Sequence, residues 1–136
     1  LVITALLKEL NAKFVVAKAK QDIQANLLTR IGADEVVYPE REMAEKLAVR
    51  YNATNIFDFI ELTKEYAIYE IPVPSAWMGK TISEINIRQK YKINIIAMKI
   101  NNDLKLLPGA DYRFTETDHM VVIGKATDVF KLSARK

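Results

Sequence analysis

The side chains that could carry out chemistry are few and far apart in this chain. His119 is the single histidine and there is no cysteine, so thiolate nucleophiles and cysteine-based zinc sites are excluded. Without a second histidine, His119 is more simply a surface residue that begins a strand than a metal ligand. The serines lie in no motif that pairs a nucleophile with a base, and they are Ser75, Ser83 and Ser133. We therefore expect a protein that is not an enzyme.

Sites for a phosphate group or a metal ion find little support in the sequence. A dinucleotide fingerprint needs glycines close together, so that the backbone can approach a pyrophosphate at a helix N-terminus. The four glycines of the chain are each far from the next, at positions 32, 79, 109 and 124. An acidic loop formed by Asp111, Glu116 and Asp118 could hold a cation. A solvated turn is the simpler interpretation of this loop, and we expect no metal site.

The composition is that of an ordinary globular protein with one domain or two small ones. The 136 residues are 50% hydrophobic and 27% charged, with a formal net charge of +3. The basic residues are spread among 17 acidic ones rather than clustered, so no nucleic-acid partner is expected. No apolar run approaches the roughly 20 residues of a membrane span, and there is no signal-peptide pattern. The chain opens in an apolar run without an initiator Met, which suggests a processed or excised fragment.

The first half of the chain alternates helix and strand. Helices are predicted at 5–10, 22–31 and 41–51, and strands at 13–19 and 35–38. This is the order of a doubly wound α/β sheet, but two parallel strands do not make a stable sheet alone. Residues 1–65 are therefore predicted to be the end of a larger Rossmann-like lobe with its crossover helices, or a piece completed by another chain. The run 55–62 is too apolar to be left solvated.

Residues 66–136 are predicted to form a separate α+β domain, with an antiparallel-rich sheet and packed helices. The pattern Thr81-Ile82-Ser83-Glu84 is a capping box that begins a helix over 81–90. Asn101 and Asn102 tolerate the positive φ of a tight hairpin turn. Pro72 and Pro74 mark a local sheet edge in the strand 67–74.

The predicted strand 93–100 is largely apolar on both faces. One face is therefore expected to pack on the domain's own helices, and the other on a partner. Strict alternation places Asn94, Ile96, Met98 and Ile100 on one face and Ile93, Ile95, Ala97 and Lys99 on the other. A strand MVVIG ending at Gly124 and a closing helix over 127–134 complete the domain.

Four ordered segments carry a specific resemblance. They are WMGKTISEINIRQKY (77–91), INIIAMK (93–99), LPGAD (107–111) and TDHMVVIG (117–124). In this order they resemble the C-terminal regulatory domain of the RCK family, the TrkA and KtrA type cytosolic subunits that gate potassium channels and transporters. The first half is similar to the end of the RCK Rossmann lobe, with IGADEVVYPEREMA (31–44) at its last strand and crossover entry. Thr117 departs from the glycine that the family commonly has before the aspartate.

The resemblance implies a homodimer within a larger RCK ring and a ligand at the dimer interface. In KtrA-type members that ligand is cyclic di-AMP, to which a two-fold interface can offer one cation per phosphate and one apolar wall per base. Arg88 matches the family's phosphate-facing arginine, and Asn94 matches a nearby polar position. The apolar walls and the closing loop position would be Ile82, Ile87, Ile96 and Ala110, the last in place of a proline. The family's NAD(H) or ATP site would lie upstream, so no cofactor is required in this chain.

Plainer roles remain open for the same residues. Arg88 could be a solvated cation at a helix end, where the helix dipole favours positive charge. Asn94 could be an ordinary polar residue at a strand end, and the isoleucines could be core residues.

The function expected from the resemblance is a cytoplasmic gating subunit of a potassium channel or transporter, bound to the membrane only through that partner. A ligand that bridges two regulatory domains would shift the populations of two domain arrangements. Two alternatives stand beside it. One is a ligand-sensing domain attached to a cation antiporter or a metabolic enzyme, and the other is an oligomerisation module without a ligand.

Overall fold

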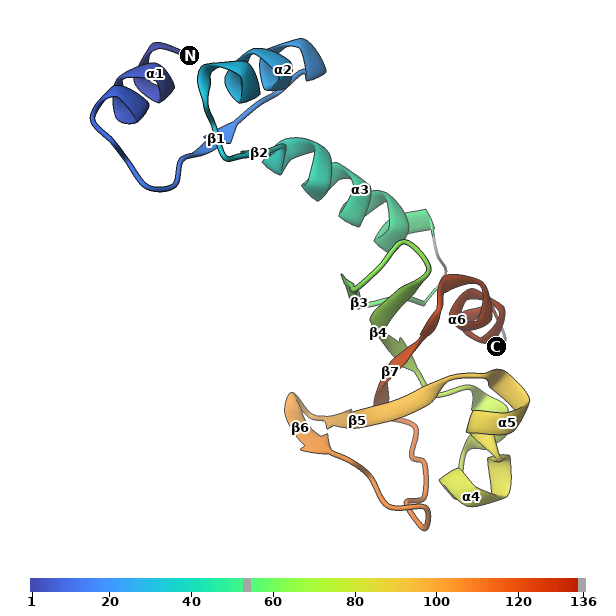
Figure 1. Cartoon of the computed structure of the whole chain (residues 1–136). Helices are drawn as coiled ribbons and strands as arrows, with labels where there is room; N and C mark the ends of the chain where they lie inside the picture. The colour runs from blue at the N-terminus through green and yellow to red at the C-terminus, as the bar shows by residue number, and fades with distance from the viewer. Residues whose placement is uncertain (53–54, 135–136) are drawn as a thin grey trace. The chain divides into compact units, whose positions relative to one another are not determined.

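The computed structural model describes residues 1–52 and 55–134, which divide into two compact units, Leu1–Leu47 and Ala48–Lys136 (Figure 1). The first unit holds α1 (Val2–Glu9), β1 (Val16–Lys18), α2 (Asp22–Ile31), β2 (Glu35–Val37) and the start of α3 (Pro39–Asn52). The second holds β3 (Asp58–Glu61), β4 (Tyr66–Pro72), the 3₁₀ turn η1 (Ser75–Trp77), α4 (Ile82–Ile85), α5 (Ile87–Tyr91), β5 (Asn94–Ile100), β6 (Asp103–Leu106), β7 (His119–Lys125) and α6 (Ala126–Ser133).

The first unit is a short α/β segment. Its strands β1 and β2 pair in parallel, as the sequence predicts, with Val16 opposite Glu35. Helix α2 ends at Ile31 and is capped by Gly32, whose φ of 115° is left-handed and therefore suits a residue without a side chain. The carboxylate of Asp34 joins the parts of the unit, because it accepts bonds from Lys8 Nζ at 2.6 Å and from the Val15 N–H at 2.7 Å.

The second unit is built on an antiparallel sheet of strands in the order β3-β4-β7-β5-β6 among the described residues. Buried and half-buried residues alternate along the central strands β4 and β7. Such alternation is typical of a sheet with one face on a core and one face directed outward. The predicted α+β domain with its antiparallel sheet is confirmed.

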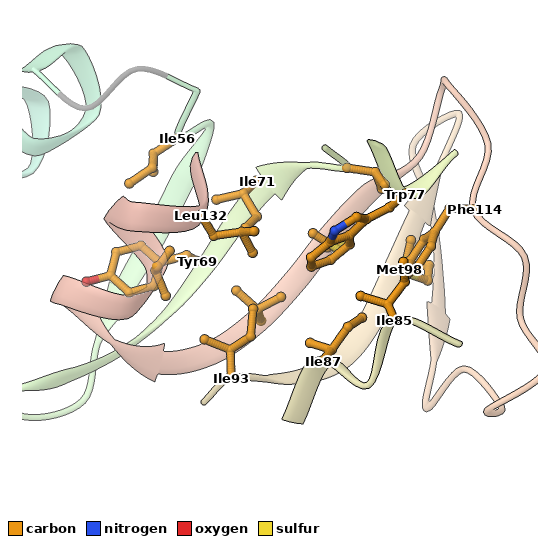
Figure 2. Close-up of a cluster of buried hydrophobic side chains, with 14 of the residues drawn as sticks. Ile56, Tyr69, Ile71, Trp77, Ile85, Ile87, Ile93, Met98, Phe114 and Leu132 are labelled. Atoms are coloured by element: carbon orange, nitrogen blue, oxygen red, sulfur yellow. The ribbon is translucent and has the colours of Figure 1, made fainter. Parts of the chain in front are cut away.

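The core lies on one face of this sheet, which we call the inner face. Ile71, Met98, Met120 and Val122 are fully buried there. Helix α6 supplies Val129 and Leu132, and Trp77 and Phe114 close the other end of the cluster (Figure 2). Each such side chain contributes roughly 1.5–3 kcal/mol when it is removed from water. The core is therefore the main source of stability for the second unit.

Residues 55–62 do not lie with the first half of the chain, as the sequence analysis had them. Asp58 pairs with Glu70 and Glu61 with Ala67, so β3 is a strand of the second unit's sheet. The reason is that Ile56 is buried in the second unit's core, which places the residues that follow it beside β4. Among the described residues, the pairing of β4 with β3 ends at Glu70. Pro72, which has no N–H to donate, lies beyond this point, where β4 pairs with β7 alone.

Two local features of the second unit differ from the sequence analysis. The helix predicted over 81–90 is broken at Asn86, which adopts a left-handed conformation with φ 53° and ψ 49° and separates α4 from α5. Strand β5 contains a bulge between Ile95 and Ala97, so the predicted strict alternation of its faces is wrong. Asn94, Ala97 and Lys99 share the outer face of the sheet, opposite to the inner face of Met98. Asn101 and Asn102 have positive φ values of 49° and 68° and form the predicted tight turn.

Candidate functional site

The candidate site begins at the N-terminus of α4. Thr81 Oγ1 accepts a bond from the Glu84 N–H at 3.2 Å, and the Thr81 N–H donates to Glu84 Oε2 at 2.8 Å. This is the capping box that the sequence predicts. The bond from the Thr81 backbone also holds the pKa of Glu84 below its usual value. The first turn of α4 is thereby fixed in place.

The break at Asn86 decides which side chains of the following turn face outward. Asparagine adopts left-handed angles more readily than most residues, because its short polar side chain can bond locally. The turn lets Ile87 enter the core, where it is 3% exposed, while Arg88 beside it is exposed. Figure 2 shows Ile87 among the buried side chains of the core.

Arg88 and Asn94 lie in direct contact. Arg88 Nε donates a hydrogen bond to Asn94 Oδ1 at 2.8 Å, and both residues are exposed. The bond uses one of the five guanidinium donors and leaves both terminal nitrogens for another acceptor. A planar guanidinium held in this way can bind a phosphate or carboxylate through two parallel bonds.

The apolar residues of the expected site fall into two groups. Ile87 belongs to the core, whereas Ile82 and Ile96 are half-buried and Ala110 is exposed. The loop that carries Ala110 is tied to α4, because the Ser83 N–H donates to the Ala110 carbonyl at 2.9 Å. A second bond joins the Ile82 N–H to the Tyr112 carbonyl at 3.1 Å. Ala110 and Ile82 thus lie on neighbouring, hydrogen-bonded segments.

A second polar cluster was missed in the sequence analysis. The Glu70 carboxylate contacts Lys99 Nζ at 3.2 Å and His119 Nδ1 at 3.0 Å. The His119 ring stacks on Phe57, with centroids 4.1 Å apart and planes 5° apart. These groups and Asn101, Asn102 and Thr117 line a shallow polar pocket. The sequence did contain one indication of this cluster, a glutamate within the otherwise apolar strand 67–73. A half-buried carboxylate needs a polar or charged partner.

The acidic loop is anchored by hydrogen bonds. Asp118 is 2% exposed, and its Oδ2 accepts bonds from the Thr115 N–H at 2.8 Å and the Tyr112 hydroxyl at 2.9 Å. Burial and the bond to Asp118 raise the pKa of Tyr112 to about 12. Over residues 1–52 and 55–134, no three histidine or carboxylate side chains are arranged to hold a metal ion. Within the same part of the chain, no helix has the length and apolar character needed to cross a bilayer.

Comparison with known proteins gives consistent results. The sequence model described as the TrkA-C domain matches residues 66–135. Ktr system potassium uptake protein C of Bacillus subtilis (strain 168) is 36% identical over 132 residues, which cover 97% of this chain and 60% of that protein. Ktr system potassium uptake protein A of the same strain is 33% identical over 126 residues, covering 93% of this chain and 57% of that protein. The chain therefore spans at most about 60% of the length of these relatives.

Among solved structures, that of the GsuK RCK domain aligns over 98% of this chain and 30% of that chain. The TM-score is 0.51 and the sequence identity is 22%, so the likeness is one of fold.

Proposed function

The chain belongs to the TrkA-C domain family, and from this premise we propose that it is part of a non-enzymatic regulatory subunit of a potassium uptake system. The observation that carries the proposal is the 36% identity to a Ktr system protein over 97% of the chain. The subunit acts in the cytoplasm and reaches the membrane through its transporter partner. No cofactor is needed within this chain.

The ligand in this proposal is cyclic di-AMP, bound where two copies of the second unit meet. The arrangement of Arg88 supports the assignment, because its terminal nitrogens are left available beside a fixed Asn94. Two such arginines related by two-fold symmetry supply one charge-assisted contact to each phosphate. The Asn94 bond reduces the rotamer freedom that Arg88 would otherwise lose on binding.

The apolar contacts to the bases come from Ile82 and Ile96, and Ala110 closes the loop side. All three are at least partly accessible in the single chain. Ile87 supports the site from the core, because its burial fixes the residue next to Arg88. Ala110 offers less apolar surface than a proline would, so its contact is the weakest of the set.

The homodimer is proposed to form through the outer face of the sheet and its β6 edge. Register places Ile60, Leu104 and Leu106 on this face, where they are 60%, 57% and 67% exposed. Asn94 lies on the same face, as the partner of Ile123. Dimer contact and ligand contact therefore share one surface, and a ligand that bridges two copies favours one arrangement of the dimer over others.

Calorimetry with cyclic di-AMP on the chain and on Arg88→Ala tests the ligand assignment. Bonds to a charged donor are worth about 1.5–3 kcal/mol, and symmetry removes two of them. Loss of one such bond weakens binding by roughly tenfold to a hundredfold, so the variant, which loses two, should bind at least about a hundredfold more weakly. Arg88→Lys should give an intermediate loss, because it keeps the charge without the planar fork.

Gln89→Ala is the matched control, since Gln89 is exposed on the same short helix and its side-chain oxygen accepts a bond from Asn86 Nδ2 at 3.2 Å, away from Arg88 and Asn94. It should bind like the wild type, and thermal melts should show that all variants are folded. Ile82→Asp should abolish binding by placing a charge against the base. Unchanged binding by Arg88→Ala removes Arg88 from the site, and no binding by the wild type removes this ligand.

Sedimentation at micromolar concentration tests the dimer. The wild type should sediment as a dimer, and Leu106→Glu should shift it toward monomer because it places a charge on the apolar surface. A wild type that is wholly monomeric would contradict the proposed interface.

A further inference from the structure

The chain enters the second unit through three consecutive residues that each contact a different part of it. Asn55 Nδ2 donates to the carbonyl of Ser133, the last residue of α6, at 3.2 Å. Ile56 is 4% exposed and belongs to the inner core. The Phe57 N–H donates to the Glu70 carbonyl of β4 at 2.9 Å. We call residues 55–57 the entry anchor.

Phe57 extends this anchor to the outer face of the sheet. Its ring lies flat on His119, with a centroid separation of 4.1 Å and an interplanar angle of 5°. The histidine ring is itself oriented, because its Nδ1 contacts Glu70 Oε1 at 3.0 Å. Lys99 Nζ holds the same carboxylate from β5 at 3.2 Å, and the Glu70 side chain is only 16% exposed. Phe57 therefore stacks on a ring whose position is fixed by two neighbouring strands.

We propose that the entry anchor is a locking device, in which His119, oriented by Glu70, holds Phe57 against the sheet. Ile56 packs in the core on the inner face, and Phe57 stacks on His119 on the outer face. The backbone at these residues therefore cannot shift or rotate relative to β4 without breaking contacts on both faces of the sheet. Residues held in this way do not serve as a hinge, because a hinge must absorb changes in φ and ψ. A displacement of residue 55 is thus passed to β4 and β7.

The entry anchor is connected through the sheet to the strand that carries part of the candidate site. His119 lies on β7, which pairs with β4 on one side and with β5 on the other. Strand β5 begins at Asn94, the partner of Arg88. The lock therefore connects the point of chain entry to the strand of the candidate site through two adjacent strand pairings. It stands whether or not cyclic di-AMP is the ligand.

Hydrogen exchange of the whole chain, read by mass spectrometry on peptides covering 55–62, tests the lock. Phe57→Ala and His119→Ala should each raise the exchange rate of this segment by about two- to tenfold, the range expected for loss of one aromatic pair. Peptides covering β5 and the middle of β7 should keep their protection, which shows that each variant is folded. Unchanged exchange over 55–62 in His119→Ala would overturn the proposal.

Two further variants separate the ring from the charges around it. His119→Phe retains a flat ring against Phe57 but not the bond to Glu70, and it should protect 55–62 better than His119→Ala does. Lys99→Met removes the other partner of Glu70 and leaves the stacked pair, so it should leave the segment near the wild-type rate. If Lys99→Met loosened the segment as much as His119→Ala, the ion pair rather than the ring would be the lock, and the proposal would fail.

Discussion

The two units of this chain bury very different side chains. The buried cluster of the first unit is four alanines and Leu28, whereas that of the second includes Ile71, Met98, Phe114 and Trp77. The first unit leaves large apolar side chains in water, with Val2 73%, Ile3 74% and Ile23 69% exposed. Its sheet has two described parallel strands, against five antiparallel ones in the second. With a similar apolar content, the second unit forms a large core of its own, whereas the first unit needs further apolar contacts to cover its exposed side chains.

The difference between the two cores matters for the proposed regulation by a ligand. A ligand can shift a domain between arrangements only if the domain itself stays folded while it moves. The second unit meets this condition through its own core, and it also carries Arg88 and Asn94. The first unit contributes no residue to the candidate site. The proposed sensing site thus lies in the unit that has the larger buried core.

The largest expected effect is the separation of the two units. A fragment of residues 48–136 should melt cooperatively, because it retains the whole of the larger core. A fragment of residues 1–47 should show no cooperative transition, since two parallel strands and an alanine-rich cluster cannot offset its conformational entropy. Circular dichroism during heating measures both. A sharp melt of the 1–47 fragment would remove the contrast between the units.

A smaller effect is expected from a matched pair of isoleucines. Ile71→Ala should lower the free energy of unfolding by about 2–5 kcal/mol, because Ile71 is fully buried and its removal leaves a cavity. Ile23→Ala should change the stability by less than about 0.5 kcal/mol, since Ile23 is 69% exposed on α2. Urea unfolding gives both values. Comparable losses in the two variants would mean that Ile23 is covered in solution, which sedimentation of the same samples could reveal.

The smallest effect concerns two tyrosines that bond to aspartates. Tyr112→Phe should cost about 1–2 kcal/mol at neutral pH, because buried Asp118 loses a donor. Tyr38→Phe should leave the melting temperature unchanged, because its partner Asp22 is exposed and keeps Arg41. Thermal melts of both variants beside the wild type decide this.

The contribution of the Tyr112–Asp118 bond to stability depends on pH in a defined direction. Burial and the Asp118 bond raise the pKa of Tyr112 to about 12, above the value of about 10 for an unfolded chain. The folded state therefore binds the Tyr112 hydroxyl proton more tightly than the unfolded chain does. The resulting contribution to the free energy of unfolding is complete below about pH 10 and is lost as the pH rises toward 12. Tyr112→Phe should show a shallower alkaline decline than the wild type. An equal decline in both would assign the loss to other groups.

Features that depend on neighbours in sequence were predictable. The capping box at Thr81, the left-handed Gly32 and the Asn101–Asn102 turn each follow from a few adjacent residues. The break at Asn86 was not predicted, because the residues around it are compatible with a continuous helix. The stacking of Phe57 on His119 joins residues 62 positions apart, and no local pattern reports it. For the candidate site, the resemblance suggested Arg88 and Asn94, but their direct bond needed the fold that brings α5 to β5.

The bulge in β5 separates two functions along one strand. It places a single extra residue, Ile96, between two stretches of regular pairing, so that even and odd positions exchange faces after it. Asn94 and Lys99 share the outer face only because of this inversion, and Met98 reaches the core for the same reason. A strand β5 that paired regularly through Ile96, without the bulge, would turn Met98 outward and drive Lys99 into the core. Removal of Ile96 alone would close the bulge and leave Met98 and Lys99 on their present faces, so the length of β5 can change at this position without exchanging its two faces.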